Sequence, residues 1–61
     1  MSNIRIIRKS LGMTQDELAQ KVGVSQSLIH SIESGSRVGS LKTLKAIAAC
    51  LGVKLSDIIG E

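Results

Sequence analysis

The chain has 61 residues, of which 43% are hydrophobic and none is aromatic. Without Phe, Tyr or Trp it has no platform on which unpaired bases can stack, which argues against binding of single-stranded nucleic acid or RNA loops. Eight Lys and Arg against five Asp and Glu give a net charge of +3, which favours a polyanionic partner, although many small proteins without one are as basic. Three basic residues near the start have no acid between them: Arg5, Arg8 and Lys9.

The length suits one domain over residues 1–61, whose core must be held by aliphatic side chains alone. The single cysteine excludes an internal disulfide, and no Cys/His spacing fits a zinc site. Cys50 is interpreted as a small core or interface residue. We expect no metal, no cofactor and no bound small molecule. No signal peptide and no apolar run of membrane-spanning length occur, so we expect a cytoplasmic protein without a membrane partner.

Apolar residues at helical spacing, separated by glycines, predict an all-α, compact bundle of five short helices. The first helix is expected over residues 3–11. Thr14 and Glu17 form the T-x-x-E capping box that starts the second helix. The residues expected on the buried faces of these two helices are Ile4, Ile7, Leu11, Leu18, Ala19 and Val22.

Serine residues predict where the remaining helices begin. Ser25 is a natural N-cap for the third helix and Ser40 for the fourth, while Ser56 and Asp57 are expected to start a short fifth helix. The residues expected on the buried faces of the third and fourth helices are Ile29, Ile32, Leu41, Leu44, Ile47, Ala48 and Leu51.

Residues 14–35 join the second and third helices through a very short turn at Gly23, which is the arrangement of a helix-turn-helix. On a helical wheel, the side of the third helix opposite Ile29 and Ile32 is polar and contains no acid. Such a face can enter the major groove of DNA without repelling phosphates, and glutamine and serine can read base edges there. The residues on this face are Gln26, Ser27, His30, Ser31 and Ser34.

A polar helix face is also what an ordinary solvated helix presents, so the face alone does not establish DNA binding. The short turn, the capped second helix and the absence of an acid favour the DNA-reading interpretation. Leu28 fits the margin of the core better than a contact to a thymine methyl group. His30 is interpreted as an incidental surface residue, although its protonation would strengthen binding if it approached a phosphate.

Five short motifs occur in order along essentially the whole chain: LGMTQ at 11–15, ELA at 17–19, GVS at 23–25, IESG at 32–35 and LGV at 51–53. In combination they resemble the Cro/repressor or XRE-type helix-turn-helix domain, typified by lambdoid phage repressors and many bacterial regulators. The resemblance implies a lambda-repressor-like fold with its helix-turn-helix at the second and third helices. It also implies a protein encoded by a bacterium or a phage.

The resemblance implies roles for individual residues as well. Gln15 matches a glutamine that contacts a phosphate and braces the first residue of the recognition helix. Arg8 and Glu33 match an internal ion pair between the first and third helices. The positions that match base contacts are Gln26, Ser27 and Ser31, with His30 added from the polar face. The positions that match or adjoin phosphate contacts are Thr14, Gln15, Ser34, Ser36 and Arg37.

The chain departs from the family pattern in the loop before the fourth helix. A proline usually stands just ahead of the Ser-Leu pair in this loop, and here that residue is Gly39. The replacement predicts a more mobile loop. A histidine at the position of His30 is untypical as well.

The sequence therefore predicts a transcriptional regulator, with repression as the favoured role, that binds duplex DNA sequence-specifically through residues 26–34. Such domains bind as homodimers to a pseudo-palindromic operator, with half-sites about 34 Å apart. The alternative is an antitoxin or adaptor that uses the same fold to hold a protein partner. An enzyme is not expected, because no nucleophile–base set, P-loop or metal spacing is present. An apolar seam for a dimer or partner is expected at Val53, Leu55, Ile58 and Ile59.

Overall fold

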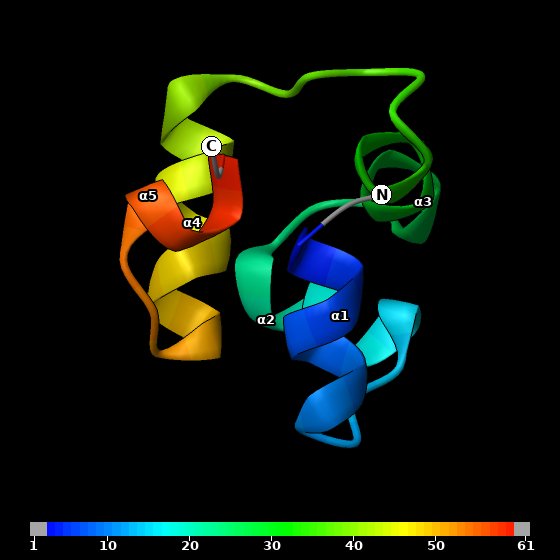
Figure 1. Ribbon diagram of the computed structural model, residues 1–61. Helices are drawn as coiled ribbons and strands as arrows, with labels where there is room; N and C mark the ends of the chain where they lie inside the picture. The colour runs from blue at the N-terminus through cyan, green and yellow to red at the C-terminus, as the bar shows by residue number, and fades with distance from the viewer. Residues whose placement is uncertain (1–2, 60–61) are drawn as a thin grey trace.

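The computed structural model describes residues 3–59, and its helices enclose an aliphatic core (Figure 1). These residues contain five α-helices and no strand, which confirms the predicted all-α class. Residues 1–2 and 60–61, which the predicted domain includes, lie outside the described residues. The helices are α1 (Asn3–Ser10), α2 (Gln15–Val22), α3 (Gln26–Ser34), α4 (Leu41–Leu51) and α5 (Leu55–Ile59).

The centre of the core is shared by α2, α3 and α4. Leu18, Ile29 and Ile47 contribute one side chain from each of these helices, and all three have an exposure of 0%. Burying an aliphatic side chain of this size stabilises a fold by about 1.5–3 kcal/mol relative to leaving it in water. Ile4 of α1 and Ile58 of α5 belong to the same cluster, so every helix places at least one apolar residue in the core.

The three central helices begin at the side-chain caps that the sequence predicts. Thr14 Oγ1 accepts from the N–H of Glu17 at 3.0 Å, and Glu17 Oε1 accepts from the N–H of Thr14 at 2.8 Å, which completes the capping box. The backbone and side-chain hydrogen bonds of Thr14 lower the pKa of the exposed Glu17 carboxyl. Ser25 and Ser40 cap α3 and α4, and each accepts from the N–H three residues on at 3.1 Å.

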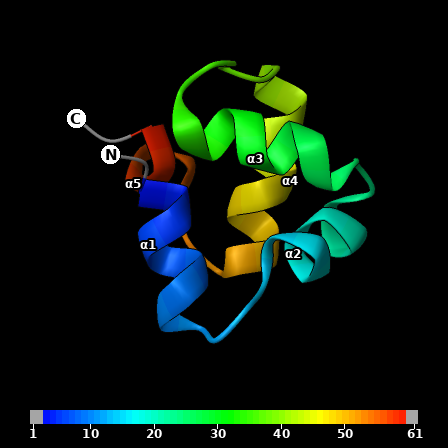
Figure 2. The same ribbon diagram turned by 90° about the vertical axis from the view of Figure 1, so that its right-hand side faces the viewer.

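A turn at residues 23–25 sets the angle between α2 and α3. Gly23 adopts a φ of +85°, and the N–H groups of Gly23 and Val24 donate to the carbonyl of Ala19 at 2.8 and 3.0 Å. Glycine is favoured at a left-handed position that closes a helix in this way. Figure 2 shows the result: α3 crosses the front of the molecule above α2, with α4 behind it, and no other element covers its front side.

Two apolar residues at helix ends are wrongly predicted to be buried. Leu11 is 54% exposed, because α1 ends at Ser10 and Leu11 lies in the following turn instead of on the helix face. Leu41 is 57% exposed, because it is the first residue of α4 and the buried face of that helix starts a turn later at Leu44.

The last helix also begins earlier than predicted. α5 starts at Leu55 instead of at Ser56, and the side chain of Asp57 accepts from the N–H of Lys54 at 3.0 Å. The first turn of α5 is therefore closed by the carboxylate of Asp57, one of the two residues expected at the start of this helix, which accepts from a backbone N–H three residues earlier. At the same place Asn3 Nδ2 donates to the carbonyl of Asp57 at 3.0 Å, which ties α1 to α5.

Gly39 has a structural role that the proline of the family pattern could not take. Its φ is +83°, whereas the proline ring restricts φ to about −65°. A Cβ atom built on Gly39 would lie 3.0 Å from Cδ1 of Ile32 in α3. The glycine therefore lets the loop between α3 and α4 pack its backbone directly on the core.

Replacing Gly39 by alanine is expected to destabilise the fold more than replacing Gly12 by alanine. Both glycines have a positive φ, +83° and +69°, so each substitution introduces the strain of a left-handed alanine, about 1–2 kcal/mol. Only the new methyl group at Gly39 presses on Ile32, because a Cβ at Gly12 meets nothing within 4 Å. Urea unfolding of both variants measures the difference, and equal losses would show that Ile32 yields without cost.

Candidate nucleic-acid interface

The outward side of α3 forms a polar surface with a shallow hollow of about 360 Å³. No acidic side chain lines this hollow. On the opposite side of the helix Ile29 and Ile32 are buried in the core, and Leu28 is half-buried against it, as the core-margin interpretation predicts. The polar surface can approach a DNA backbone without charge repulsion. The residues that line the hollow are Gln15, Gln26, Ser27, His30 and Ser31.

Arg8 and Glu33 form a buried salt bridge that joins α1 to α3. Arg8 Nε lies 2.6 Å from Glu33 Oε2, and Arg8 Nη2 donates to Glu33 Oε1 at 3.0 Å, so the contact is bidentate. The remaining guanidinium nitrogen, Nη1, donates to the carbonyl of Met13 at 2.7 Å. The two side chains are only 7% and 2% exposed. Each of the three nitrogens of Arg8 donates inside the protein, and the burial of the side chain withholds it from DNA.

Gln15 joins this pair from the first position of α2. Its Nε2 donates to Glu33 Oε1 at 3.0 Å. The family resemblance implies instead that Gln15 braces Gln26, and the structure brings the two glutamines to the same hollow but directs the hydrogen bond of Gln15 to Glu33. Glu33 therefore accepts from donors on two other helices. We call this set, Arg8, Gln15 and Glu33, the Glu33 network.

The Glu33 network keeps its carboxylate ionised. Burial by itself raises the pKa of Glu33, but the hydrogen bonds from Arg8 and Gln15 and the positive charges of Arg8 and Arg5 outweigh it. The pKa of Glu33 consequently lies below the ordinary glutamate value, and the hydrogen bond to Glu33 raises the pKa of Arg8. Both residues are charged at neutral pH, and no buried side-chain nitrogen or oxygen of the described residues lacks a partner.

The residues predicted to contact phosphates differ in how free their donors are. The hydroxyl oxygen of Thr14 accepts from the Glu17 N–H, which leaves the hydroxyl hydrogen to donate elsewhere. Ser34 and Ser36 both donate to the carbonyl of Ser31, at 3.1 and 3.2 Å, so a phosphate would have to replace that contact.

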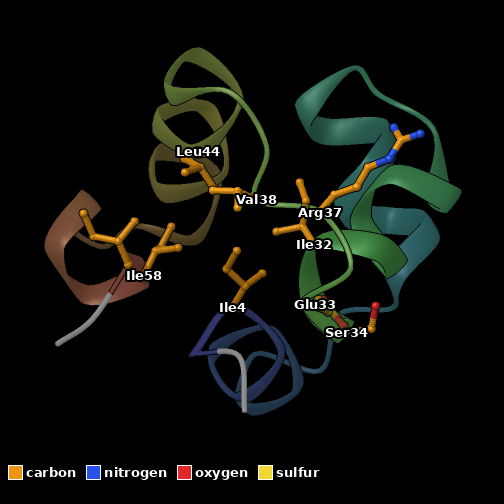
Figure 3. Close-up of a pocket in the computed structure, with 10 residues that line it drawn as sticks. Ile4, Ile32, Glu33, Ser34, Arg37, Val38, Leu44 and Ile58 are labelled. Atoms are coloured by element: carbon orange, nitrogen blue, oxygen red, sulfur yellow. The ribbon is translucent and has the colours of Figure 1, made fainter.

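Arg37 lies beyond the end of α3 and is exposed. Its backbone N–H donates to the carbonyl of Ser31 at 3.1 Å, which holds the chain against the helix end. Figure 3 shows its guanidinium directed away from the apolar cavity beneath the loop. Within residues 3–59 its side chain forms no hydrogen bond or salt bridge with the protein, so Arg37 offers a free positive charge.

The predicted apolar seam is exposed only in part. Val53 and Leu55 are half-buried and pack against the core, and Ile59 is 57% exposed. The assignment of Ile58 to the seam is wrong, because this residue is 7% exposed and belongs to the core. Sequence reasoning missed Val38, which is 80% exposed and borders a cavity of about 360 Å³ with Ile59 (Figure 3). An apolar residue in an otherwise polar loop was the available signal.

A second polar hollow, of about 170 Å³, lies between α1 and α3. Arg5 and Lys9 line it, although neither was among the predicted site residues. The signal that could have indicated them is the group of basic residues without an acid in α1. We call this second hollow the α1–α3 hollow.

The described residues contain neither a candidate metal site nor a helix that could cross a membrane. Within residues 3–59 no group of three or more His, Cys, Asp and Glu side chains could hold a metal ion. None of the helices in this range combines the length and the apolar character needed to cross a membrane. Cys50 is a half-buried free thiol that packs against the core, in line with its interpretation as a small packing residue.

Removing one partner of the salt bridge is expected to be far more damaging than removing both. Arg8→Met or Glu33→Met alone leaves a buried charge without its counter-ion, which costs roughly 3–5 kcal/mol. The double variant replaces the pair by apolar side chains and should lose less than the more damaging single variant. Urea unfolding at low temperature measures the three changes, and additive losses would show that the two side chains act independently.

The stability of the fold should fall in acid because of Glu33. A glutamate with a lowered folded-state pKa contributes stability that is complete above the ordinary value, about 4.3, and is lost as the pH falls through the folded-state pKa. Glu33→Gln should be less stable than the wild type at pH 7 and should show a shallower loss below about pH 4. Asp16→Asn, an exposed acid outside the Glu33 network, should keep the steep loss. If the unfolding free energy falls equally steeply with decreasing pH in the wild type and in Glu33→Gln, the acid sensitivity does not come from Glu33.

Comparison with known proteins agrees with this geometry. A family model described as Helix-turn-helix matches residues 4–58. The chain is 43% identical over 58 residues to the immunity repressor protein of Bacillus phage phi105, covering 95% of this chain and 40% of that protein. It is 40% identical over 57 residues to an uncharacterised HTH-type transcriptional regulator of Methanocaldococcus jannaschii, covering 93% and 86%.

A third relative is an antitoxin. The chain is 34% identical over 59 residues to Antitoxin PezA of Streptococcus pneumoniae, covering 97% of this chain and 37% of that protein. The chain thus spans about two fifths of the phage repressor and of the antitoxin, and most of the Methanocaldococcus regulator. Since the family model covers nearly the whole of it, the chain belongs to the helix-turn-helix family, in agreement with its resemblance to XRE-type domains.

Proposed function

We propose that the chain binds duplex DNA sequence-specifically, with α3 in the major groove, and acts in the cytoplasm as a regulator that represses transcription. The observation that carries the proposal is the exposed, acid-free polar side of α3, presented by the helix-turn-helix that α2 and α3 form. An α-helix fits the major groove, where each base pair presents a distinct pattern of donors and acceptors. The role is one of binding, not of catalysis.

Base reading falls to the polar side of α3. Gln26, at the first position of the helix, can pair in a bidentate way with the N6/N7 edge of adenine. Ser27 and Ser31 can donate to or accept from several bases, so they add contact with little selectivity. His30 lies on the same surface and presents an imidazole to the groove.

Phosphate contacts fix the position of α3 in the groove. The free hydroxyl hydrogen of Thr14 and the unpaired guanidinium of Arg37 are the donors best placed for this role, because neither has to give up a contact in the protein. Gln15 donates one of its two amide hydrogens to Glu33 and can offer the other to a phosphate. Contacts to phosphates are blind to sequence, so they raise affinity for every DNA alike.

We also propose that two copies bind a pseudo-palindromic operator. The similarity to a phage immunity repressor supports a repressing role, although the chain spans only 40% of that protein. Within the described residues the predicted seam offers the exposed Ile59 and the half-buried Val53 and Leu55. So small an apolar area supports a weak dimer that assembles on two adjacent half-sites.

A protein-holding role is the alternative, and the similarity to Antitoxin PezA favours it. The apolar cavity bordered by Val38 and Ile59 is the surface that such a partner would contact. This surface lies apart from the polar side of α3, so holding a partner and binding DNA do not exclude each other.

Gln26→Ala should weaken binding to the preferred operator by about 1–3 kcal/mol and relax the preference at one base pair. Arg37→Ala should weaken binding to all sequences alike, because it removes a phosphate contact. A selection from random duplex DNA at defined salt identifies the operator, and titration of operator and scrambled duplexes measures both effects. Gln20→Ala is the matched control, since Gln20 is an exposed glutamine of α2 that lines neither polar hollow. An unchanged operator preference in Gln26→Ala would show that another surface reads the bases.

A further inference from the structure

We propose that the α1–α3 hollow binds a backbone phosphate of the same duplex that α3 reads, with Arg5 and Lys9 as the residues that hold it. The inference rests on the proposed function and extends it, because it adds a phosphate contact from α1, outside the helix-turn-helix. None of the phosphate contacts implied by the family resemblance lies on α1.

The charge of the hollow is the first reason. Three cations, Arg5, Arg8 and Lys9, line it against a single carboxylate, Glu33. Arg8 and Glu33 neutralise each other in the buried salt bridge, and every nitrogen of Arg8 is occupied. The positive charges of Arg5 and Lys9 therefore remain uncompensated in the hollow.

Arg5 and Lys9 are also free to bind an anion. Both are exposed, and the Arg8–Glu33 pair is the single salt bridge found among residues 3–59. They stand four residues apart on α1, which places them on the same face of the helix one turn from each other. Two flexible basic side chains on one face can converge on a single phosphate, and arginine can do so with two parallel hydrogen bonds.

The far wall of the hollow supplies donors from α3. His30 and the hydroxyl of Ser34 both line it. The imidazole N–H can complete the coordination of a phosphate held by the two cations, and the Ser34 hydroxyl can do so by exchanging its contact to the Ser31 carbonyl for one to the phosphate. The only acid in the wall is Glu33, whose side chain is 2% exposed and bonded to its own partners.

The position of the hollow indicates that the phosphate belongs to DNA. Gln15 and His30 line both the α1–α3 hollow and the hollow on the polar side of α3, so the two adjoin along one continuous surface. A duplex whose groove receives α3 must lay a sugar–phosphate strand beside that helix. The strand on the α1 side of α3 then passes over Arg5 and Lys9.

The test compares two pairs of substitutions that remove the same charge. Arg5→Gln with Lys9→Gln empties the hollow of its free cations. Lys45→Gln with Lys54→Gln removes two exposed lysines of α4 and of the α4–α5 connection, which line neither polar hollow. Thermal unfolding of both variants confirms that they are folded. Duplex affinity is then measured between about 50 and 200 mM salt.

The variant with Arg5→Gln and Lys9→Gln, called the hollow variant, should bind operator and scrambled duplexes less tightly than the wild type, by the same factor for both. Its preference for the operator should therefore be unchanged. The slope of log affinity against log salt should become shallower by about 0.9, the value for one lost phosphate contact, while the control pair keeps the wild-type slope. A hollow variant that matches the control pair would overturn the inference while leaving the proposed function intact. A wild-type protein that binds no duplex would instead overturn the proposed function.

A second measurement separates DNA from a free anion. Amide shifts of Arg5, Lys9 and His30 are followed by NMR during titration with an operator duplex and, separately, with inorganic phosphate. We expect the duplex to shift all three at the affinity measured for DNA. Saturation by inorganic phosphate alone, with no response to the duplex, would overturn the assignment to DNA and indicate a small-anion site.

Discussion

The carboxylate of Glu33 is the constraint on which the DNA-facing side of this fold depends. It accepts from Arg8 of α1 and from Gln15 of α2, so one buried group fixes three helices relative to one another. A buried carboxylate tolerates no loss of partners, because the desolvation penalty of the charge is offset only while its hydrogen bonds are complete. An arrangement of the helices that breaks these bonds is therefore costly in free energy, and this cost favours the observed presentation of α3.

This constraint separates the residues that shape the interface from those that can touch DNA. Arg8 has the right charge for a phosphate contact, but each of its three guanidinium nitrogens already donates inside the protein and its side chain is only 7% exposed. Gln15 is held by Glu33 at the junction of the two polar hollows, so its position is fixed before any DNA arrives. A preorganised contact of this kind spares the complex part of the entropy loss of ordering a side chain.

Local features of the fold could be predicted from the sequence, and features that arise from packing could not. The caps at Thr14, Ser25 and Ser40 act within three residues along the chain, so a motif is enough to find them. Leu11 and Leu41 fit the apolar period but fall at helix ends, where burial depends on the neighbouring elements. The bond from Gln15 to Glu33 joins positions 18 residues apart, and no spacing rule points to it.

The same difference between local features and features that arise from packing applies to the two polar hollows of the candidate site. The polar side of α3 follows from a single helical wheel, because all but one of the residues lining that hollow come from one helix. The α1–α3 hollow cannot be found in this way, because its lining depends on how α1 packs against α3. The Glu33 network sets that packing and so brings the basic residues of α1 beside α3. A net charge of +3 says only that an anion is favoured. The salt bridge decides where that charge acts, since by neutralising Arg8 it leaves Arg5 and Lys9 as the free cations beside the helix that reads the groove.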